Sequence, residues 1–306
     1  MPAKTPPLVL SPRVAAAKAA GAPLVALEST IVTHGMPHPQ NFRTALAVEA
    51  AVRAAGAEPA TIAVLDGVLR IGLEEDELAA LAEAAGVLKL SRADLAFAVA
   101  FGRTGSTTVA ATMIAARAAG ISVFATGGIG GVHRGGASSL DVSADLEELA
   151  RTDVIVVSAG AKAILDIGLT LEYLETKGVP VVAYGSDELP AFWSRESGHK
   201  APLRLDRAEE IARFQKARAD LGIDGGMLVA NPLSAEHAIP RSTIEGWIDR
   251  ALADATAAGV VGKAVTPFLL GRIVELSDGR SLEANIALIE ANAKLAGEIA
   301  VALATR

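Results

Sequence analysis

Short runs of β-branched and aliphatic residues alternate along the chain with longer Ala-, Leu- and Glu-rich stretches at helical spacing. This alternation is typical of a layered α/β domain. The short runs predict strands at Leu24–Leu27, Thr61–Leu65, Leu95–Val99, Ser122–Ala125, Val154–Ser158, Val179–Tyr184 and Met227–Ala230. The periodic stretches predict helices at Arg43–Ala55, Glu75–Ala85, Thr108–Ala119, Thr170–Thr176, Ala208–Leu221, Thr243–Ala258, Thr266–Leu276 and Ala284–Ala302. Several strands are apolar throughout, which predicts a sheet covered by helices on both faces.

A further strand, Val68–Ile71, follows Thr61–Leu65 directly after the dipeptide Asp66-Gly67. Asp-Gly between two apolar runs is the strongest short-range signal of a β-hairpin. We therefore expect a mixed, mostly parallel sheet with a small antiparallel flap. No repeat with a period of about 20–50 residues and no Pro/Ser-rich linker divides the chain, so residues 1–306 are expected to form a single domain.

The composition narrows the class of protein. The chain has 306 residues, of which 51% are hydrophobic, so it can fill a sizeable core. Its net charge of −7 and its lack of a basic run argue against a nucleic-acid partner. The absence of cysteine excludes disulfides, thiolate nucleophiles and Cys-ligated metal sites. No apolar stretch reaches the roughly 20 residues that cross a bilayer, and the Pro-rich N-terminus does not resemble a secretory signal. We expect a cytoplasmic protein that does not bind a membrane.

Four segments rich in glycine, hydroxyl groups or charge follow predicted strands, where open α/β sheets bind their ligands. In the first, Glu28 comes directly after a strand. A carboxyl group near apolar strand ends has a raised pKa and can donate a proton at neutral pH, although pairing with a cation or capping a turn is equally compatible with the sequence. In another, Lys162 follows the apolar run VIVVSAG with no acidic neighbour within three residues. A poorly solvated amine there can attack carbonyl carbon, whereas the alternative is an ordinary surface lysine.

The segment GRTGSTT, residues 102–108, resembles a phosphate-binding turn, because small residues and hydroxyls precede a predicted helix. It lacks the lysine of a Walker A loop, and a simple N-cap by Ser106 or Thr107 is the alternative. Lys89 could supply a cation to the same phosphate or be a solvated strand lysine.

The segment TGGIGGVHRGG lacks the spacing of a dinucleotide-binding loop, and its glycines must be mobile or closely packed. It leads into Asp141, Ser143 and Asp145. The carboxylates of the two aspartates suit a hard cation such as Mn²⁺ or Mg²⁺ that keeps most of its waters. The alternative is that Ser143 or Asp145 caps the next helix. The histidines are not spaced as a zinc pair, so hydrogen-bonding roles are expected for them.

Six ordered blocks carry a family resemblance: ALESTIVTHGMPHPQN, GRTGSTTVAATM, FATGGIGGVHRGG, DVSADLEEL, the run from SAGAKAILDIG to ELPAFW, and LEANIALIEANAKLAG. Together they resemble the pseudouridine-5′-phosphate glycosidases, also called the indigoidine synthase A-like family, from about residue 9 to the C-terminus. The resemblance implies an α/β/α layered fold distantly similar to ribokinase-type sugar kinases, a homotrimer, and one divalent ion per subunit, usually Mn²⁺. It also implies reversible conversion of pseudouridine 5′-phosphate and water to uracil and ribose 5-phosphate.

The matching positions imply roles for individual residues. Lys162 would be the nucleophile that forms a Schiff base, and Glu28 the proton donor. Asp141 falls on the metal position. The substrate-binding positions are Lys89, Val109, Thr126, His133, Ser143, Ala144, Asp145 and Asn285. Arg103 stands where the family has lysine, and this change keeps the positive charge.

Two other interpretations compete with this one. A ribokinase-like kinase would need a GAGD-type anion hole, and no such sequence occurs. A sugar-phosphate-binding regulator would not require both Glu28 and Lys162, so their joint presence favours an enzyme.

Overall fold

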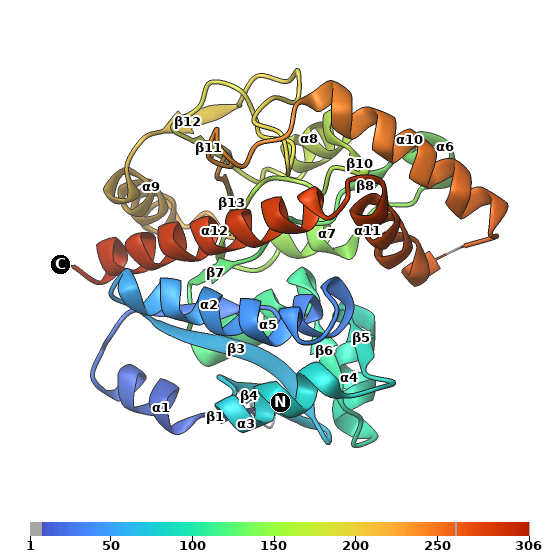
Figure 1. Ribbon diagram of the computed structural model, residues 1–306. Helices are drawn as coiled ribbons and strands as arrows, with labels where there is room; N and C mark the ends of the chain where they lie inside the picture. The colour runs from blue at the N-terminus through green and yellow to red at the C-terminus, as the bar shows by residue number, and fades with distance from the viewer. Residues whose placement is uncertain (1–7, 261, 306) are drawn as a thin grey trace.

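Eleven strands form a mixed sheet at the centre of the computed structural model, which describes residues 8–260 and 262–305 (Figure 1). They are β1 (Leu8–Leu10), β2 (Leu24–Leu27), β3 (Glu58–Leu65), β4 (Val68–Ile71), β5 (Leu88–Leu90), β6 (Gly105–Thr107), β7 (Val123–Ala125), β9 (Ile155–Ser158), β11 (Val181–Tyr184), β12 (Leu203–Leu205) and β13 (Met227–Ala230). The strand order is β1-β4-β3-β2-β7-β9-β13-β11-β12, with β6 on β3 and β5 on β6. Among the described residues of this sheet, only β3–β4 and β3–β6 pair antiparallel, which confirms a mostly parallel mixed sheet.

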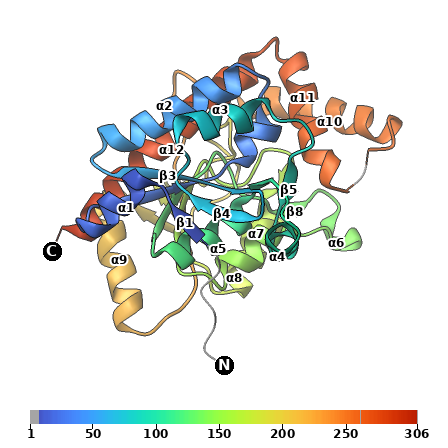
Figure 2. The same ribbon diagram turned by 90° about the horizontal axis from the view of Figure 1, so that it is seen from below.

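Helices cover both faces of this sheet, so the predicted three layers are confirmed (Figure 2). The helices are α1 (Pro12–Ala19), α2 (Gln40–Ala54), α3 (Glu75–Glu83), α4 (Arg92–Ala100), α5 (Val109–Ala119), α6 (Gly136–Ser139), α7 (Ala144–Leu149), α8 (Ile167–Thr176), α9 (Ala208–Asp220), α10 (Arg241–Ala257), α11 (Val265–Leu276) and α12 (Arg280–Ala304). Helices α2 and α12 lie on one face, and α5 with α7 lies on the other. A small antiparallel pair, β8 (Val132–His133) with β10 (Leu165–Asp166), lies apart from the main sheet.

The predicted hairpin is confirmed at β3 and β4. Asp66 and Gly67 both have positive φ, 48° and 79°, as the tight turn between twisted antiparallel strands requires. A Cβ on Gly67 would lie 2.8 Å from the Cα of Gly102, so this turn also packs against the chain just before β6. Because β1 pairs with β4, the hairpin is built into the edge of the sheet.

The many alanines allow the helices to approach one another closely. A Cβ on Gly297 of α12 would lie 2.6 Å from the Cβ of Ala55, at the end of α2. Helix α5 is buried along most of its length between the sheet and α7, because seven of its eleven residues are alanine or valine. The core therefore consists of small side chains in close layers, with few aromatic rings.

The predicted strand Leu95–Val99 is wrong, because these residues lie in α4. Ser91 and Asp94 form a capping box that starts this helix, with the Ser91 N–H donating to Asp94 Oδ2 at 3.0 Å. This local hydrogen bonding outweighs the strand preference of the apolar run. The other predicted elements are present with ends shifted by at most four residues.

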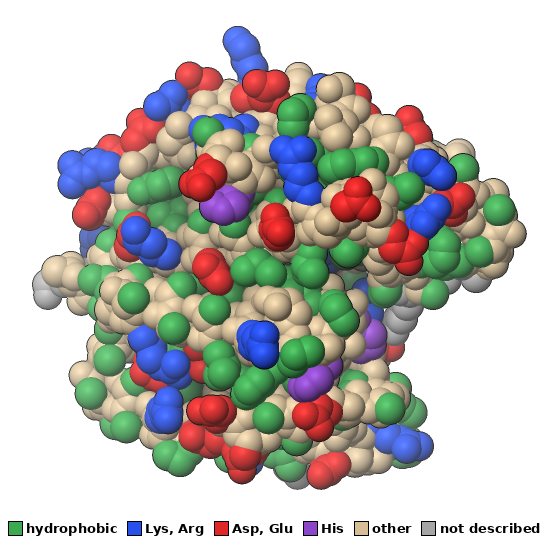
Figure 3. Space-filling view, viewed as in Figure 1, with side chains coloured by type: hydrophobic (Ala, Val, Ile, Leu, Met, Phe, Trp, Pro, Cys, Tyr) green, Lys and Arg blue, Asp and Glu red, His purple; other side chains and the backbone are tan. Residues whose placement is uncertain are grey.

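Positively and negatively charged side chains intermix on the face formed by α2 and α12 (Figure 3). Among the described residues, none of the helices combines the length and apolarity needed to cross a membrane. The first seven residues, on which the expectation of no secretory signal partly rests, lie outside the described residues.

Candidate active site

Three neighbouring parallel strands end at the same place. Glu28 follows β2 directly, Thr126 follows β7 directly, and Lys162 comes four residues after β9. The chain leaves β2 toward β3 on one side, whereas β7 and β9 extend the sheet on the other side. A reversal of this kind leaves a crevice at the carboxyl edge, which is where open α/β sheets bind ligands.

A cavity at this edge, here called the strand-end cavity, brings together four predicted site residues: Glu28, Lys89, Lys162 and Asn285. The apolar side chains in its wall are Ile31, Phe192, Pro267, Leu270 and Ile289. Thr30, His34, Thr266 and three glycines complete the lining. Two lysines, a carboxyl group and an amide therefore face a mainly apolar wall, the arrangement of a small-molecule site.

Glu28 is surrounded by protein and keeps part of its surface toward the cavity. Burial raises the pKa of its carboxyl group, the positive charges of Lys162 and Lys89 oppose that rise, and the negative charge of Asp145 adds to it. The Thr126 hydroxyl donates a hydrogen bond to Glu28 Oε1. That hydrogen bond also opposes the rise, and burial outweighs it, so the pKa of Glu28 is raised and a larger share of the group is the carboxylic acid that can donate a proton.

Lys162 is half-buried and held by its backbone. Its N–H donates to the Ile129 carbonyl at 3.1 Å, and its own carbonyl accepts from Leu165 at 3.0 Å. Just before it, Gly160 has a φ of 85°, and a Cβ there would lie 2.6 Å from the Pro190 carbonyl oxygen. The loop that carries the amine is therefore fixed between two neighbouring segments.

The glycine-rich segment after β7 is closely packed, which settles one alternative left open by its sequence. A Cβ on Gly130 would lie 2.1 Å from Ser143 Oγ and 2.7 Å from Asp145 Oδ2. The Gly130 N–H donates to that same Oδ2 at 2.8 Å. Glycine is required here because the start of α7 occupies the space of a side chain.

Asp145 links this loop to the N-terminus of α5. Its Oδ1 accepts the N–H of Ala110 at 3.0 Å, and its side chain is almost fully buried. The predicted N-cap of α5 by Ser106 or Thr107 is wrong, since both residues lie in β6 and the carboxylate of Asp145 accepts a hydrogen bond from the first turn instead. The predicted cap of α7 by Ser143 is confirmed, because Ser143 Oγ accepts the N–H of Asp145.

Hydrogen bonds from hydroxyl and backbone groups join the chain after β2 to β3 and β6. Ser29 Oγ donates to the Ile62 carbonyl at 2.7 Å and accepts from the Thr107 N–H at 3.0 Å. Thr30 Oγ1 donates to the Thr107 carbonyl, and Thr33 Oγ1 donates to Ser106 Oγ. Of the hydroxyls suggested for phosphate binding, Ser106 Oγ accepts from Thr33 and Thr107 Oγ1 donates to the Ile62 carbonyl at 2.8 Å, whereas Thr108 Oγ1 is buried without a partner among the described residues.

His34 belongs to a short π-helical turn, η1 (Ile31–Gly35), and lines the cavity near Lys89. Its Nδ1 lies 2.6 Å from Thr33 Oγ1 and 3.3 Å from Ser106 Oγ. Burial and the charge of Lys89 lower the pKa of His34, so the neutral imidazole is favoured. The hydrogen-bonding role expected for histidine is confirmed at this position.

His133 and Asp141 lie together beside β8, outside the lining of the strand-end cavity. The His133 Nδ1 and Asp141 Oδ2 atoms are 3.9 Å apart, and the Asp141 side chain is 62% exposed. In the part of the chain that the structure describes, no group of three or more His, Cys, Asp or Glu side chains could hold a metal. The exposed carboxylate of Asp141 suits a hard divalent ion that keeps most of its waters. Asp145 is a less suitable ligand for such an ion, because both of its carboxylate oxygens already accept hydrogen bonds from backbone N–H groups.

The remaining predicted residues also lie outside the cavity lining. Val109, Ser143 and Ala144 lie around the contact between α5 and α7, with Val109 buried at the start of α5. Phe192 and the α11 residues Thr266, Pro267 and Leu270 line the cavity but were not predicted. An apolar residue in a helix or an Ala-Phe-Trp run carries no sequence signal that separates a cavity wall from ordinary core.

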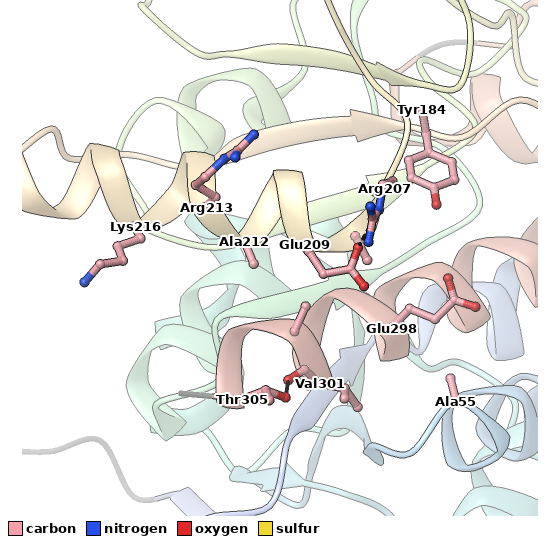
Figure 4. Close-up of a pocket in the computed structure, with 12 residues that line it drawn as sticks. Ala55, Tyr184, Arg207, Glu209, Ala212, Arg213, Lys216, Glu298, Val301 and Thr305 are labelled. Carbon is pink, nitrogen blue, oxygen red and sulfur yellow. Dashed lines mark hydrogen bonds and ion pairs between the residues drawn. The ribbon is translucent and has the colours of Figure 1, made fainter.

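A second cavity lies between α9, α12 and the end of β11 (Figure 4). Tyr184, Arg207, Glu209 and Glu298 line it, and burial together with nearby carboxylates raises the pKa of Tyr184. None of the predicted site residues is among the described residues that line it. The strand-end cavity is therefore the candidate active site.

Comparison with known proteins assigns the family. The family model described as indigoidine synthase A like protein matches residues 13–302. The chain belongs to the indigoidine synthase A-like family. It is 62% identical over 301 residues to the pseudouridine-5′-phosphate glycosidase of Jannaschia sp. (strain CCS1), covering 98% of this chain and all of that protein. It is 64% identical over 297 residues to the enzyme of the same name from Roseobacter denitrificans, covering 97% and 96% of the two chains.

Two solved structures have the same fold as this chain. The prealnumycin C-glycosynthase AlnA, in complex with ribulose 5-phosphate, superposes with a TM-score of 0.90 at 41% identity over 97% of both chains. An indigoidine synthase A-like protein from Thermotoga maritima gives a TM-score of 0.88 at 36% identity over 98% of both chains. The family resemblance identified from the six sequence blocks is confirmed.

Proposed function

We propose that the protein is a pseudouridine-5′-phosphate glycosidase that reversibly converts its substrate and water to uracil and ribose 5-phosphate. The observation that carries this proposal is the shared cavity of Lys162, Glu28 and Lys89 at the carboxyl edge of the sheet. The names of relatives that are 62% and 64% identical support the choice of substrate.

The bond to be broken joins two carbon atoms. A glycosidase with two carboxylates protonates a leaving oxygen, and a C-nucleotide has no such atom at this bond. An amine offers another route, since a nitrogen lone pair on the anomeric carbon can expel the base.

The first stage opens the ribose ring. Protonated Glu28 donates its proton to the ring oxygen as the bond between this oxygen and C1′ breaks. The Lys162 amine forms a bond from Nζ to C1′ and passes a proton to the Glu28 carboxylate. The raised pKa of Glu28 supports its role, since the acid form must be present when substrate binds.

The second stage releases the base. Glu28 returns this proton to C5 of the uracil ring, the bond from C1′ to C5 breaks, and the nitrogen lone pair forms a C=N bond between Lys162 Nζ and C1′. Water then adds to this Schiff base and frees ribose 5-phosphate and the amine. The fixed backbone of Lys162 keeps Nζ near the carbon throughout.

Lys89 supplies positive charge for the phosphate group in the same cavity. We propose that Asp141 holds a Mn²⁺ ion, which when bound would supply positive charge for substrate oxygens. Val109, Thr126, His133, Ser143, Ala144, Asp145 and Asn285 remain proposed substrate-side residues. For Asn285, support comes from its Oδ1, which is buried without a hydrogen-bond partner among the described residues.

The proposal extends to the cellular form of the enzyme, a cytoplasmic homotrimer that acts in pseudouridine catabolism. Self-association is supported by Phe97 on α4 and Phe101 directly after this helix, which are 50% and 67% exposed with ring centroids 4.8 Å apart. Analytical ultracentrifugation tests the trimer, and a monomer would contradict it.

The experiment that tests the function incubates the protein with Mn²⁺ and pseudouridine 5′-phosphate and follows uracil by chromatography. A parallel sample receives borohydride, which reduces a Schiff base to a stable amine that mass spectrometry can place on Lys162. Release of uracil with this adduct is the expected result. No uracil release, and no coupling of uracil to ribose 5-phosphate in reverse, would contradict the proposal.

A further inference from the structure

A turn at residues 191–194 lies across the end of β9 and carries an unusual backbone conformation. Phe192 has a φ of 61°, the left-handed region that bulky side chains rarely adopt. Strain of this kind persists only where the surroundings enforce it, and it concentrates at functional sites.

Hydrogen bonds hold the turn on both sides. The Phe192 N–H donates to the Ala159 carbonyl at 3.0 Å, three residues before Lys162. Ala191 and Ser194 bond to each other, and the Trp193 carbonyl accepts from Ile239 at 2.8 Å. The strained residue is therefore tied to the loop that carries the nucleophile.

The same conformation directs the Phe192 ring into the wall of the strand-end cavity. The side chain is only 2% exposed, and a Cβ on Gly128 would lie 2.6 Å from its ring. The Trp193 ring lies beside it, with centroids 5.0 Å apart and planes at 60°. Gly128 leaves the space that the ring occupies, and Trp193 limits its movement.

We propose that Phe192 is the aromatic platform for the pyrimidine base and a specificity-determining residue of the reaction. This inference rests on the proposed function. The cavity's cations, Lys89 and Lys162, suit the sugar phosphate, and an aromatic ring suits a planar base. The unpartnered Asn285 Oδ1 in the same cavity is an acceptor for an N–H group of uracil. The base is thus held by its face at Phe192 and by its edge at Asn285.

The test separates binding of the base from chemistry at Lys162. Phe192→Gly removes the ring and suits the positive φ, and Phe192→Leu keeps an apolar side chain in case the glycine variant folds poorly. Phe214→Leu, on α9 outside the cavity lining, is the matched control for loss of a ring. Two quantities are measured for each variant: KM for uracil in the reverse reaction, and the rate of borohydride trapping of ribose 5-phosphate without uracil.

Both Phe192 variants are expected to raise KM for uracil by at least about tenfold, because stacking on an aromatic ring stabilises a bound base. The trapping rate should stay within about twofold of wild type, since it involves no base, and Phe214→Leu should change neither quantity. An unchanged KM for uracil would overturn the proposal, and so would a trapping rate that falls in parallel with base binding. Wild-type protein that neither couples nor releases uracil would instead refute the proposed function, and the platform with it.

Discussion

Replacing Asp145 by asparagine tests whether this carboxylate organises the site or serves the substrate alone. Its two oxygens accept N–H groups from Ala110 at 3.0 Å and Gly130 at 2.8 Å, and the side chain is 6% exposed. Asparagine keeps the shape but has only one acceptor oxygen, so one buried N–H must face an amide nitrogen. The charge that favours the N-terminus of α5 is also lost.

The expected loss follows from those two contacts. A hydrogen bond to a charged group contributes about 1.5–3 kcal/mol, so losing one and weakening the other should cost about 3 kcal/mol of unfolding free energy. The unfolding entropy of a chain of this length is about 0.6 kcal/mol per kelvin, so Tm should fall by about 5 °C. Thermal unfolding followed by circular dichroism measures this shift.

The same substitution should change the pH profile. The negative charge of Asp145 contributes to the raised pKa of Glu28, so its removal lowers that pKa. The alkaline limb of kcat/KM, where the acid form of Glu28 is lost, should then move to lower pH. Asp141→Asn is the control, because that exposed side chain should leave Tm within about 1 °C and alter only the response to Mn²⁺. Asp145→Asn with wild-type Tm and a raised KM alone would refute the structural role.

Three further predictions concern the residues around the nucleophile. Because burial raises the pKa of Glu28, kcat/KM should fall as pH rises through that pKa, and a pH-independent rate would contradict this. Glu28→Gln should abolish turnover. It should not lower Tm at neutral pH, because ionising the buried acid disfavours the folded state. Lys162→Ala should remove borohydride trapping and lower kcat/KM by at least about a thousandfold at unchanged Tm, and retained trapping would exclude this amine. Gly130→Ala should destabilise the fold by about 2–3 kcal/mol in urea unfolding, because its Cβ meets Ser143, whereas Gly246→Ala, with nothing within 4 Å, should not.

The elements that periodicity predicted well are those that local chemistry and burial both favour. The strand Leu24–Leu27 is apolar throughout, and it lies near the middle of the sheet between β3 and β7. Leu95–Val99 failed because the decisive signal was the Ser91–Asp94 pair before it, which starts a helix whatever the following residues prefer. Three-residue strands such as β5 and β6 exist through pairing with distant partners, so their own residues could not predict them.

Some residues of the candidate site could be predicted from the sequence, and others could not. Glu28 and Lys162 could be predicted because strand ends converge at one edge of a parallel sheet, and a charged residue there stands out from an apolar run. Phe192 could not be predicted, since its importance lies in a φ value and in the space left by Gly128. The hydroxyls of residues 102–108 divide between fold and site, because Thr107 Oγ1 donates to the Ile62 carbonyl of β3, whereas Thr108 Oγ1 is buried without a partner among the described residues.

The glycines around Lys162 connect these observations into one arrangement. Gly128 accommodates the Phe192 ring, Gly130 accommodates Ser143 and Asp145, and Gly160 accommodates the Pro190 carbonyl. At each of these glycines, a neighbouring segment approaches the backbone more closely than a side chain would allow. The amine of Lys162 therefore sits on a loop fixed from several sides, which lowers the entropic cost of bringing Nζ to the anomeric carbon. A substitution at Gly130 or Gly160 should consequently reduce imine formation more than binding of the phosphate at Lys89.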